Sequence, residues 1–252
     1  MLDAWYAIFL LGLMAGAMNA LAGGGPILVV AALAALGQPA DIASLTSTVA
    51  LLPGQIASGW YARHSLVPIG PSPVRRTVAA VALLGGAVGA GLLLVTPTAM
   101  FGLALPALIL FATGLYAWNS RAGGAPAATG AMALGAGAIA VRLAPLAVYG
   151  GFYGGGNSFL VLALLARLRV PPRAAAHAKN LLVLLINAAA TLIFVASGAV
   201  AVGIAVPLGA GALVGGLAGT RLIDRIDPAR LRFVVIACGT LLALWIAARE
   251  WF

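Results

Sequence analysis

Charged residues are scarce in this sequence. They make up only 8% of its 252 residues, whereas an ordinary soluble domain carries about 25%. So few charges cannot cover a water-facing surface, and 63% of the residues are hydrophobic. We therefore predict an all-α polytopic membrane protein whose surface mostly faces lipid.

Acidic residues and cysteine are rarer still. The chain has one cysteine, Cys238, which excludes an intrachain disulfide. None of its acidic residues lies deep in an apolar run, which argues against a carboxylate relay for Na⁺ or protons inside the membrane. The five are Asp3, Asp41, Asp224, Asp227 and Glu250. With two histidines and no buried acid–base pair, a membrane-embedded enzyme is also disfavoured, and we expect no metal and no cofactor.

Basic residues outnumber acidic ones and give a net charge of +9. They gather in short loops between apolar runs, which is typical of the positive-inside rule and not of nucleic-acid binding. We expect a multi-pass protein of the prokaryotic plasma (inner) membrane with these loops in the cytoplasm. The basic positions are Arg63, Arg75 and Arg76; Arg121; Arg167, Arg169 and Arg173; and Arg221, Arg225, Arg230 and Arg232.

Long apolar runs fill most of the chain. Most can span a bilayer, which takes about 20 residues, but 26–36 and 158–168 are too short. Each short run follows a glycine cluster, Gly23–Gly25 or Gly154–Gly156. The predicted runs are 4–22, 26–36, 42–62, 74–95, 98–118, 130–152, 158–168, 174–197, 199–220 and 230–248.

An internal repeat relates the two halves of the sequence. An offset of 132 residues pairs Gly23 with Gly155 and Pro39 with Pro171. We predict a first repeat at 1–121, a linker at 122–129 and a second repeat at 130–252 within one membrane domain. The basic loop at 61–76 corresponds to an uncharged loop near 198–200, so equivalent loops lie on opposite sides. This pattern predicts inverted-topology repeats with broken or re-entrant helices that meet near the midplane. Each half then has five spans, or three spans and a re-entrant hairpin.

Several motifs resemble those of a known family. They are GAMNALAGGGPILVV at 16–30, SLTSTVALLPGQIASGWYAR at 44–63, GFYGGGNSFLVLALL at 151–165, HAKNLLVLLINAAATLIFVASGAV at 177–200 and GALVGGLAGTRL at 211–222. In this order they resemble the sulfite exporter TauE/SafE family of membrane transporters over nearly the whole chain. The resemblance implies transport of sulfite, organosulfonates or related small anions. Asn157 departs from the pattern, since a glycine or small residue is common there.

The glycine clusters predict a binding site because each creates a new helix N-terminus at membrane depth. Such an end carries unpaired N–H groups and a partial positive charge, and it binds anions without a cationic side chain. Pro26 suits the first turn of one new helix. Asn157 and Ser158 would suit the cap of the other. The alternative is that the glycines only permit close packing, the role we expect for the GGxxG motifs at 85–89 and 215–219.

Polar residues are dense in the run that follows each break. Hydroxyls and amides suit a small oxyanion as neutral donors, although hydrogen bonding between helices is the alternative role. We predict a substrate site from both groups together with the breaks. Its members are Asn19, Gly23, Gly24, Gly25, Thr46, Ser47, Thr48, Gln55, Gly155, Gly156, Asn157, Ser158, Lys179, Asn180 and Asn187.

Three basic side chains have open alternatives. Lys179, the single lysine, either neutralises the anionic substrate or extends to the cytoplasmic interface. His177 is a candidate proton carrier together with Lys179, or a histidine at a helix start. Arg142 either guards an anion vestibule or marks a helix end.

These patterns favour a secondary transporter of small sulfur-containing anions that works by alternating access. An anion channel is the main alternative. The expected partners are the anionic substrate and the lipid bilayer, with no nucleic acid, and a homodimer is left open.

Overall fold

The computed structural model describes residues 2–21, 23–61, 69–121 and 135–222, with scattered helical residues between 233 and 248. These described segments are helical and contain no strand. The helices are α1 (Leu2–Leu21), α2 (Gly25–Ala35), α3 (Ala40–Tyr61), α4 (Ser72–Val95), α5 (Thr98–Arg121), α6 (Ala136–Phe152), α7 (Asn157–Arg167), α8 (Pro172–Ser197) and α9 (Val202–Leu222). The predicted linker and most of the last apolar run lie outside the described residues.

Helix lengths follow the apolar runs of the sequence. Within the described segments, four helices are long and apolar enough to cross a membrane, namely α1, α4, α8 and α9. The polar residues of α3 lower its hydropathy, although its 22 residues exceed the length that a span needs. The prediction of a polytopic helical membrane protein is therefore confirmed.

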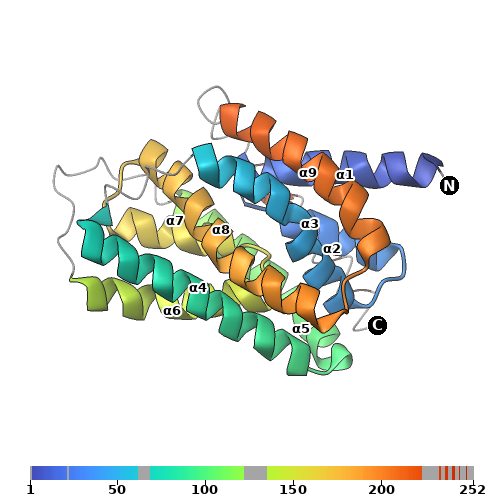
Figure 1. Cartoon of the computed structure of the whole chain (residues 1–252), viewed down its shortest axis with the longest axis horizontal. Helices are drawn as coiled ribbons and strands as arrows, with labels where there is room; N and C mark the ends of the chain where they lie inside the picture. Colours follow the sequence, from blue (N-terminus) through green and yellow to red (C-terminus); the bar gives the residue numbers. More distant parts are fainter. Residues whose placement is uncertain are drawn as a thin grey trace.

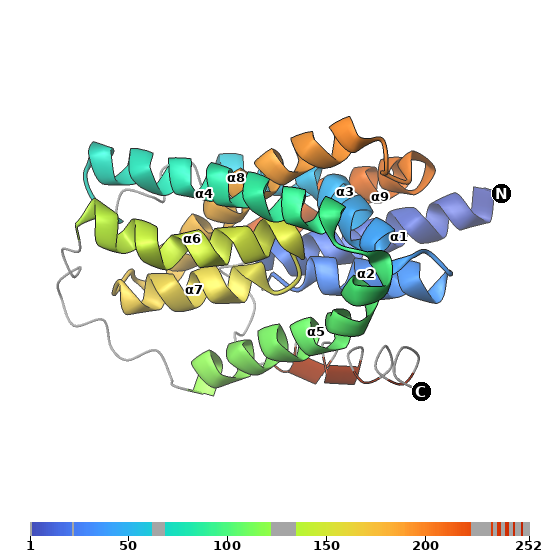
Figure 2. The ribbon, with the colours of Figure 1, turned by 90° about the horizontal axis from the view of Figure 1, so that it is seen from below.

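The two short helices each fold back on the helix before them (Figures 1 and 2). In Figure 2, α2 returns toward the side where α1 begins, and α7 returns toward the side where α6 begins. Each short helix has 11 residues, or about 16 Å at 1.5 Å per residue. A hydrocarbon core of about 30 Å is too thick for such a helix to cross.

Glycines allow helices from the two ends of the chain to pack in close contact. A Cβ atom at Gly211 or Gly215 of α9 would overlap the backbone of α1, at Phe9 and Leu13. In the same way, a Cβ atom at Gly89 of α4 would overlap the backbone of α6. The packing role expected for the two GGxxG motifs agrees with these contacts.

The polar helices α3 and α8 occupy the middle of the bundle. Helix α3 packs against α8 and α9, whereas α8 packs against α3 and α4. Here too backbones touch, because a Cβ atom at Gly216 would overlap Gly54 and one at Gly86 would overlap Ile186. This central position buries the polar side chains of α3 and α8 away from lipid.

Candidate functional site

The first break separates α1 from α2. Gly23 has a φ of +91°, a left-handed conformation that L side chains rarely adopt. Gly24 precedes the first helical residue of α2, and Pro26 lies in its first turn as predicted. Since proline lacks an N–H group, it removes one donor that would otherwise be unpaired at a helix start.

The second break separates α6 from α7. Gly154 and Gly156 both have a φ of +75°, and Gly156 is the cap residue of α7. The prediction that Asn157 and Ser158 cap this helix is wrong. Asn157 is its first helical residue, and no side chain makes a capping hydrogen bond. A left-handed glycine makes the turn instead, which leaves the amide of Asn157 free for other contacts.

The two breaks lie against each other. A Cβ atom at Gly23 would overlap the side chain of Ser158 in the first turn of α7. At the other break, a Cβ atom at Gly154 would lie 3.3 Å from the hydroxyl of Thr48 on α3. Segments more than 100 positions apart in the sequence therefore meet in one buried region.

Lys179 reaches the end of α1 from α8. Its side chain is 0% exposed, so the alternative that it extends to the membrane interface is wrong. The Nζ atom donates hydrogen bonds of 3.0 Å to the carbonyl oxygens of Asn19 and Ala20. These carbonyls belong to the last turn of α1, where a helix carries unpaired acceptors and a partial negative charge.

A pair of amides joins α3 to α8 in the interior. Asn187 donates from Nδ2 to Oε1 of Gln55 over 3.0 Å. The two residues are 132 positions apart, which is the offset of the internal repeat. The second polar atom of each amide, Nε2 of Gln55 and Oδ1 of Asn187, is buried without a partner.

Buried polar atoms without hydrogen-bond partners are concentrated on the predicted site residues. Native proteins contain few such atoms, because burying one without a partner costs about 1–3 kcal/mol. Both amide atoms of Asn157 are among them. The others on predicted residues are Oγ of Ser47, Nε2 of Gln55, Nδ2 of Asn180 and Oδ1 of Asn187. The donors among these atoms, on Ser47, Gln55, Asn157 and Asn180, can bind the oxygens of a small bound molecule.

Comparison with protein families gives a match over nearly the entire chain. Residues 8–246 match the family described as "Sulfite exporter TauE/SafE". The chain belongs to this family. Membership supports membrane transport of sulfur-containing anions, as expected from the motifs. Neither the curated proteins nor the solved structures gave a match.

Every residue that the sequence places in the site of this TauE/SafE protein is buried. Asn19 lies beside Gly25, since a Cβ atom on that glycine would contact the Asn19 side chain. Gly155 lies under the ring of Tyr153. Thr46 differs from the adjacent Ser47, because its hydroxyl accepts a hydrogen bond of 3.1 Å from the backbone N–H of Ala201 between α8 and α9. That contact accounts for Thr46 without a ligand.

The remaining basic candidates lie apart from the breaks. His177 is half-buried near the start of α8, and its ring centroid is 5.7 Å from that of Tyr61. Arg142 is exposed on α6 and donates to the carbonyl of Ala138 one turn earlier in the same helix. Their roles in proton transfer and anion entry stay predictions.

Sequence reasoning missed several polar residues near the second break of this family member. Ser44 donates from Oγ to the carbonyl of Tyr153 at the end of α6 over 3.2 Å. The hydroxyl of Tyr149 lies 3.0 Å from the carbonyl of Gly155, and that of Tyr153 is buried without a partner. Thr191, also unpaired, lies one turn beyond Asn187 on α8. That helical spacing is the one signal that could have identified it.

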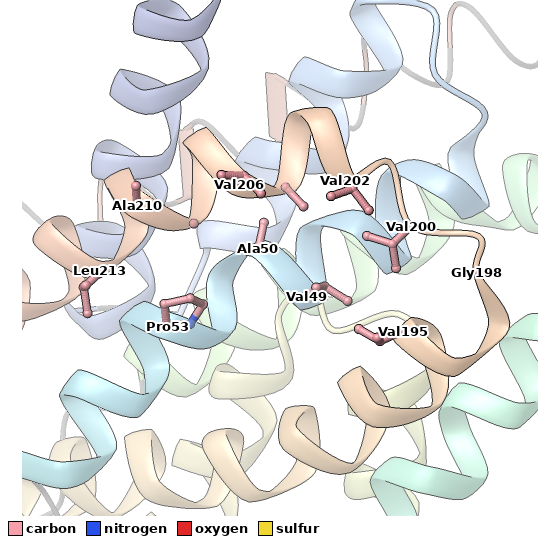
Figure 3. Close-up of a pocket in the computed structure, with 12 residues that line it drawn as sticks. Val49, Ala50, Pro53, Val195, Gly198, Val200, Val202, Val206, Ala210 and Leu213 are labelled. Atoms are coloured by element: carbon pink, nitrogen blue, oxygen red, sulfur yellow. The ribbon is translucent and has the colours of Figure 1, made fainter.

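An apolar cavity lies outside the polar region (Figure 3). It has a volume of about 600 Å³ and opens between α3, the end of α8 and α9. Val49, Pro53, Val195 and Val206 are among its lining residues, and none of the predicted site residues lines it. Its lining offers almost no hydrogen-bonding group, so it does not suit a small anion.

Proposed function

We propose that this protein is a secondary transporter that carries a small sulfur-containing oxyanion by alternating access. The substrate is sulfite, an organosulfonate or a related anion, and it binds between the two helix breaks. One observation carries the proposal: buried polar atoms without partners are concentrated on Ser47, Gln55, Asn157, Asn180 and Asn187. A bound oxyanion would satisfy the donors among them and remove their desolvation cost.

Both short helices supply further donors. The first N–H groups of a helix have no partner within it, and α2 and α7 begin at the breaks inside the protein. Lys179 lies beside the first break and, in its protonated form, provides a full positive charge. Hydrogen bonds to a charged group are stronger than neutral ones, so this set favours an anion over a neutral solute.

An inverted-repeat arrangement is part of the proposal, and helix contacts support it. In an inverted repeat, helices α1 to α4 correspond in order to helices α6 to α9. The contact between α1 and α9 then corresponds to the contact between α6 and α4. The contact between α3 and α9 becomes the one between α8 and α4. All four contacts are present. The hydrogen bond between Gln55 and Asn187 joins equivalent residues of the two repeats, which is expected where they face each other across a twofold axis.

Loop positions also support opposite orientation of the two halves. In Figures 1 and 2, the ends of α3 and α9 lie toward the left, with the starts of α4 and α8. The turns from α4 to α5 and from α8 to α9 lie toward the right. The described basic residues at the left-hand ends include Arg75 and Arg76 in α4 and Arg221 in α9, so the positive-inside rule assigns that side to the cytoplasm.

Transport in sealed proteoliposomes tests the function. We expect saturable uptake of radiolabelled sulfite or methanesulfonate, accelerated when unlabelled substrate is present on the opposite side. Asn157→Ala and Asn187→Ala should each lower the rate at least about tenfold. The first removes a buried amide donor for the substrate, and the second removes the hydrogen bond that orients Gln55, whose Nε2 is a free donor. Thr220→Ala is the matched control, because Thr220 is also buried but bonds only to Gly216 in its own helix.

Two outcomes would contradict the proposal. Equal transport rates of the wild type and the variants Asn157→Ala and Asn187→Ala would contradict the proposed position of the substrate site. Flux that rises linearly with substrate concentration and shows no counterflow would instead indicate a channel. A thermal-unfolding measurement on each variant distinguishes a lost site from a lost fold.

A further inference from the structure

The two halves differ in charge at one pair of equivalent positions. Ser47 on α3 lies 132 positions before Lys179 on α8. Both residues are 0% exposed. The hydroxyl of Ser47 has no hydrogen-bond partner, whereas Lys179 bonds to the end of α1. The first break therefore has a cationic side chain beside it, whereas the equivalent position in the other half holds a neutral hydroxyl.

Lys179 is the one charged side chain that is buried within the described part of the chain. Asp41 is the one acidic residue whose side chain is described there, and its Oδ2 accepts a hydrogen bond from Thr98 at the start of α5. No ion pair to Lys179 is present among these residues. With Lys179 protonated, the described part of the buried region thus carries a single positive charge.

The partial charges of the helix ends do not change the net charge of this buried region. At each break the C-terminal end of one helix, α1 or α6, lies next to the N-terminal end of the next, α2 or α7. The two ends carry partial charges of about −0.5 and +0.5, so their sum at each break is close to zero. The full charge of Lys179 therefore dominates.

From this balance we propose that the site selects singly charged oxyanions over doubly charged ones. The inference rests on the proposed transport function and narrows its substrate class to anions such as sulfonates and bisulfite, with sulfate rejected. A monoanion beside Lys179 gives a neutral pair. A dianion leaves one negative charge uncompensated in a buried region, where an unpaired charge costs several kcal/mol.

The donors around Lys179 fit this assignment. Two of the three N–H groups of its ammonium bond to Asn19 and Ala20, so one is left for a substrate oxygen. Ser47, Asn157 and Asn180 contribute unpaired groups that carry no charge. They can bind the other oxygens of a tetrahedral anion without compensating a second negative charge.

A set of ligands with similar shape and different charge tests the proposal. Dimethyl sulfone is neutral, methanesulfonate carries one negative charge, and sulfate carries two even at mildly acidic pH. Binding to the purified full-length protein would be measured by calorimetry at one mildly acidic pH, which favours the protonated form of a lysine. We expect methanesulfonate to bind at least about a hundredfold more tightly than either of the others. Equal binding of methanesulfonate and sulfate would overturn the proposal.

Ser47→Lys extends the test because it places a second lysine at the equivalent position. We expect this variant to bind sulfate more tightly than methanesulfonate, which reverses the order in the wild type. Ser47→Met is the control for side-chain size and should keep the original order. An unchanged order in folded Ser47→Lys protein would count against the inference.

Lys179→Gln serves if Ser47→Lys does not fold. It keeps a hydrogen-bond donor and removes the charge, so dimethyl sulfone should then bind at least as well as methanesulfonate. Continued preference for methanesulfonate would contradict the role of Lys179. If the wild type binds none of these ligands, nor sulfite, the proposed function itself fails; if it binds monoanion and dianion alike, only the charge selection fails.

Discussion

The two helix breaks differ in the side chain that binds the end of the preceding helix. At the first, Lys179 of α8 bonds to two carbonyls of α1. At the second, Ser44 of α3 bonds to the carbonyl of Tyr153, which follows α6. In both places a side chain from the third helix of the opposite half supplies the donor. The carbonyl end of a helix at a break can therefore be satisfied by a charged or a neutral group, and only the charged group adds an electrostatic preference for anions.

The glycines of the breaks can also be compared with a left-handed glycine elsewhere. Gly23 (φ +91°) faces Ser158, whereas a Cβ atom at Gly37 (φ +84°), just after α2, would meet no other atom within 4 Å. We expect Gly23→Ala to have the largest effect, with a loss of stability about 1–3 kcal/mol greater than that of Gly37→Ala, because overpacking adds to backbone strain. Chemical unfolding and ligand binding of both variants would measure it. Similar stability and affinity in the two variants would show that the breaks do not depend on this contact.

The comparison between Lys179 and Ser44 is tested directly by replacing each of these side chains with an apolar one. Lys179→Met should lower methanesulfonate affinity about a hundredfold, since it removes a buried charge that contacts the anion. Ser44→Ala should cost about 1 kcal/mol of stability, the value of one neutral hydrogen bond, and leave affinity within about threefold. Isothermal calorimetry and thermal unfolding give both quantities. A larger loss of affinity in Ser44→Ala would reverse the assigned roles.

The amide pair between the halves should have an intermediate effect. In a double-mutant cycle of Gln55→Ala and Asn187→Ala, we expect a coupling energy of about 1 kcal/mol in unfolding experiments. Because the pair joins α3 to α8, the coupling measures how strongly the halves are held together at their crossing. Additive effects of the two substitutions would mean that the hydrogen bond is not formed in the folded protein in solution.

The smallest expected effect distinguishes two adjacent hydroxyls. Thr46→Ala should reduce stability by about 1 kcal/mol through the lost contact with Ala201 and leave anion affinity unchanged. Ser47→Ala should leave stability nearly unchanged and reduce affinity by about tenfold or less. Binding and unfolding data on both variants provide the check. Weaker anion binding by Thr46→Ala would return Thr46 to the site.

Much of the fold could be predicted because its signals are local. The lengths of α2 and α7 follow from the positions of the glycine clusters, and Pro26 indicated a helix start correctly. The cap of α7 could not be predicted in this way. Asn157 and Ser158 have suitable side chains, but the left-handed backbone of Gly156 already makes the turn. The residue preferences of the sequence do not decide between a side-chain cap and a left-handed glycine at this helix start.

For the candidate site, residue type predicted which side chains are buried more reliably than it predicted their hydrogen-bond partners. Dense polar residues in α3 and α8 had to avoid lipid, and all of those assigned to the site are buried. Their partners depend on contacts across the bundle. Thr46 and Ser47 are adjacent and chemically similar, yet one bonds to Ala201 and the other has no partner.

The sequence alone determined that this protein is a helical membrane protein with two glycine breaks, because hydropathy, charge and backbone freedom are properties of single residues and their spacing. The tertiary structure decided which groups meet. It placed Gly23 against Ser158, joined Gln55 to Asn187 and buried Lys179 at the end of α1. Those contacts connect residues more than 130 positions apart, and only the packing of whole helices brings them within hydrogen-bond distance.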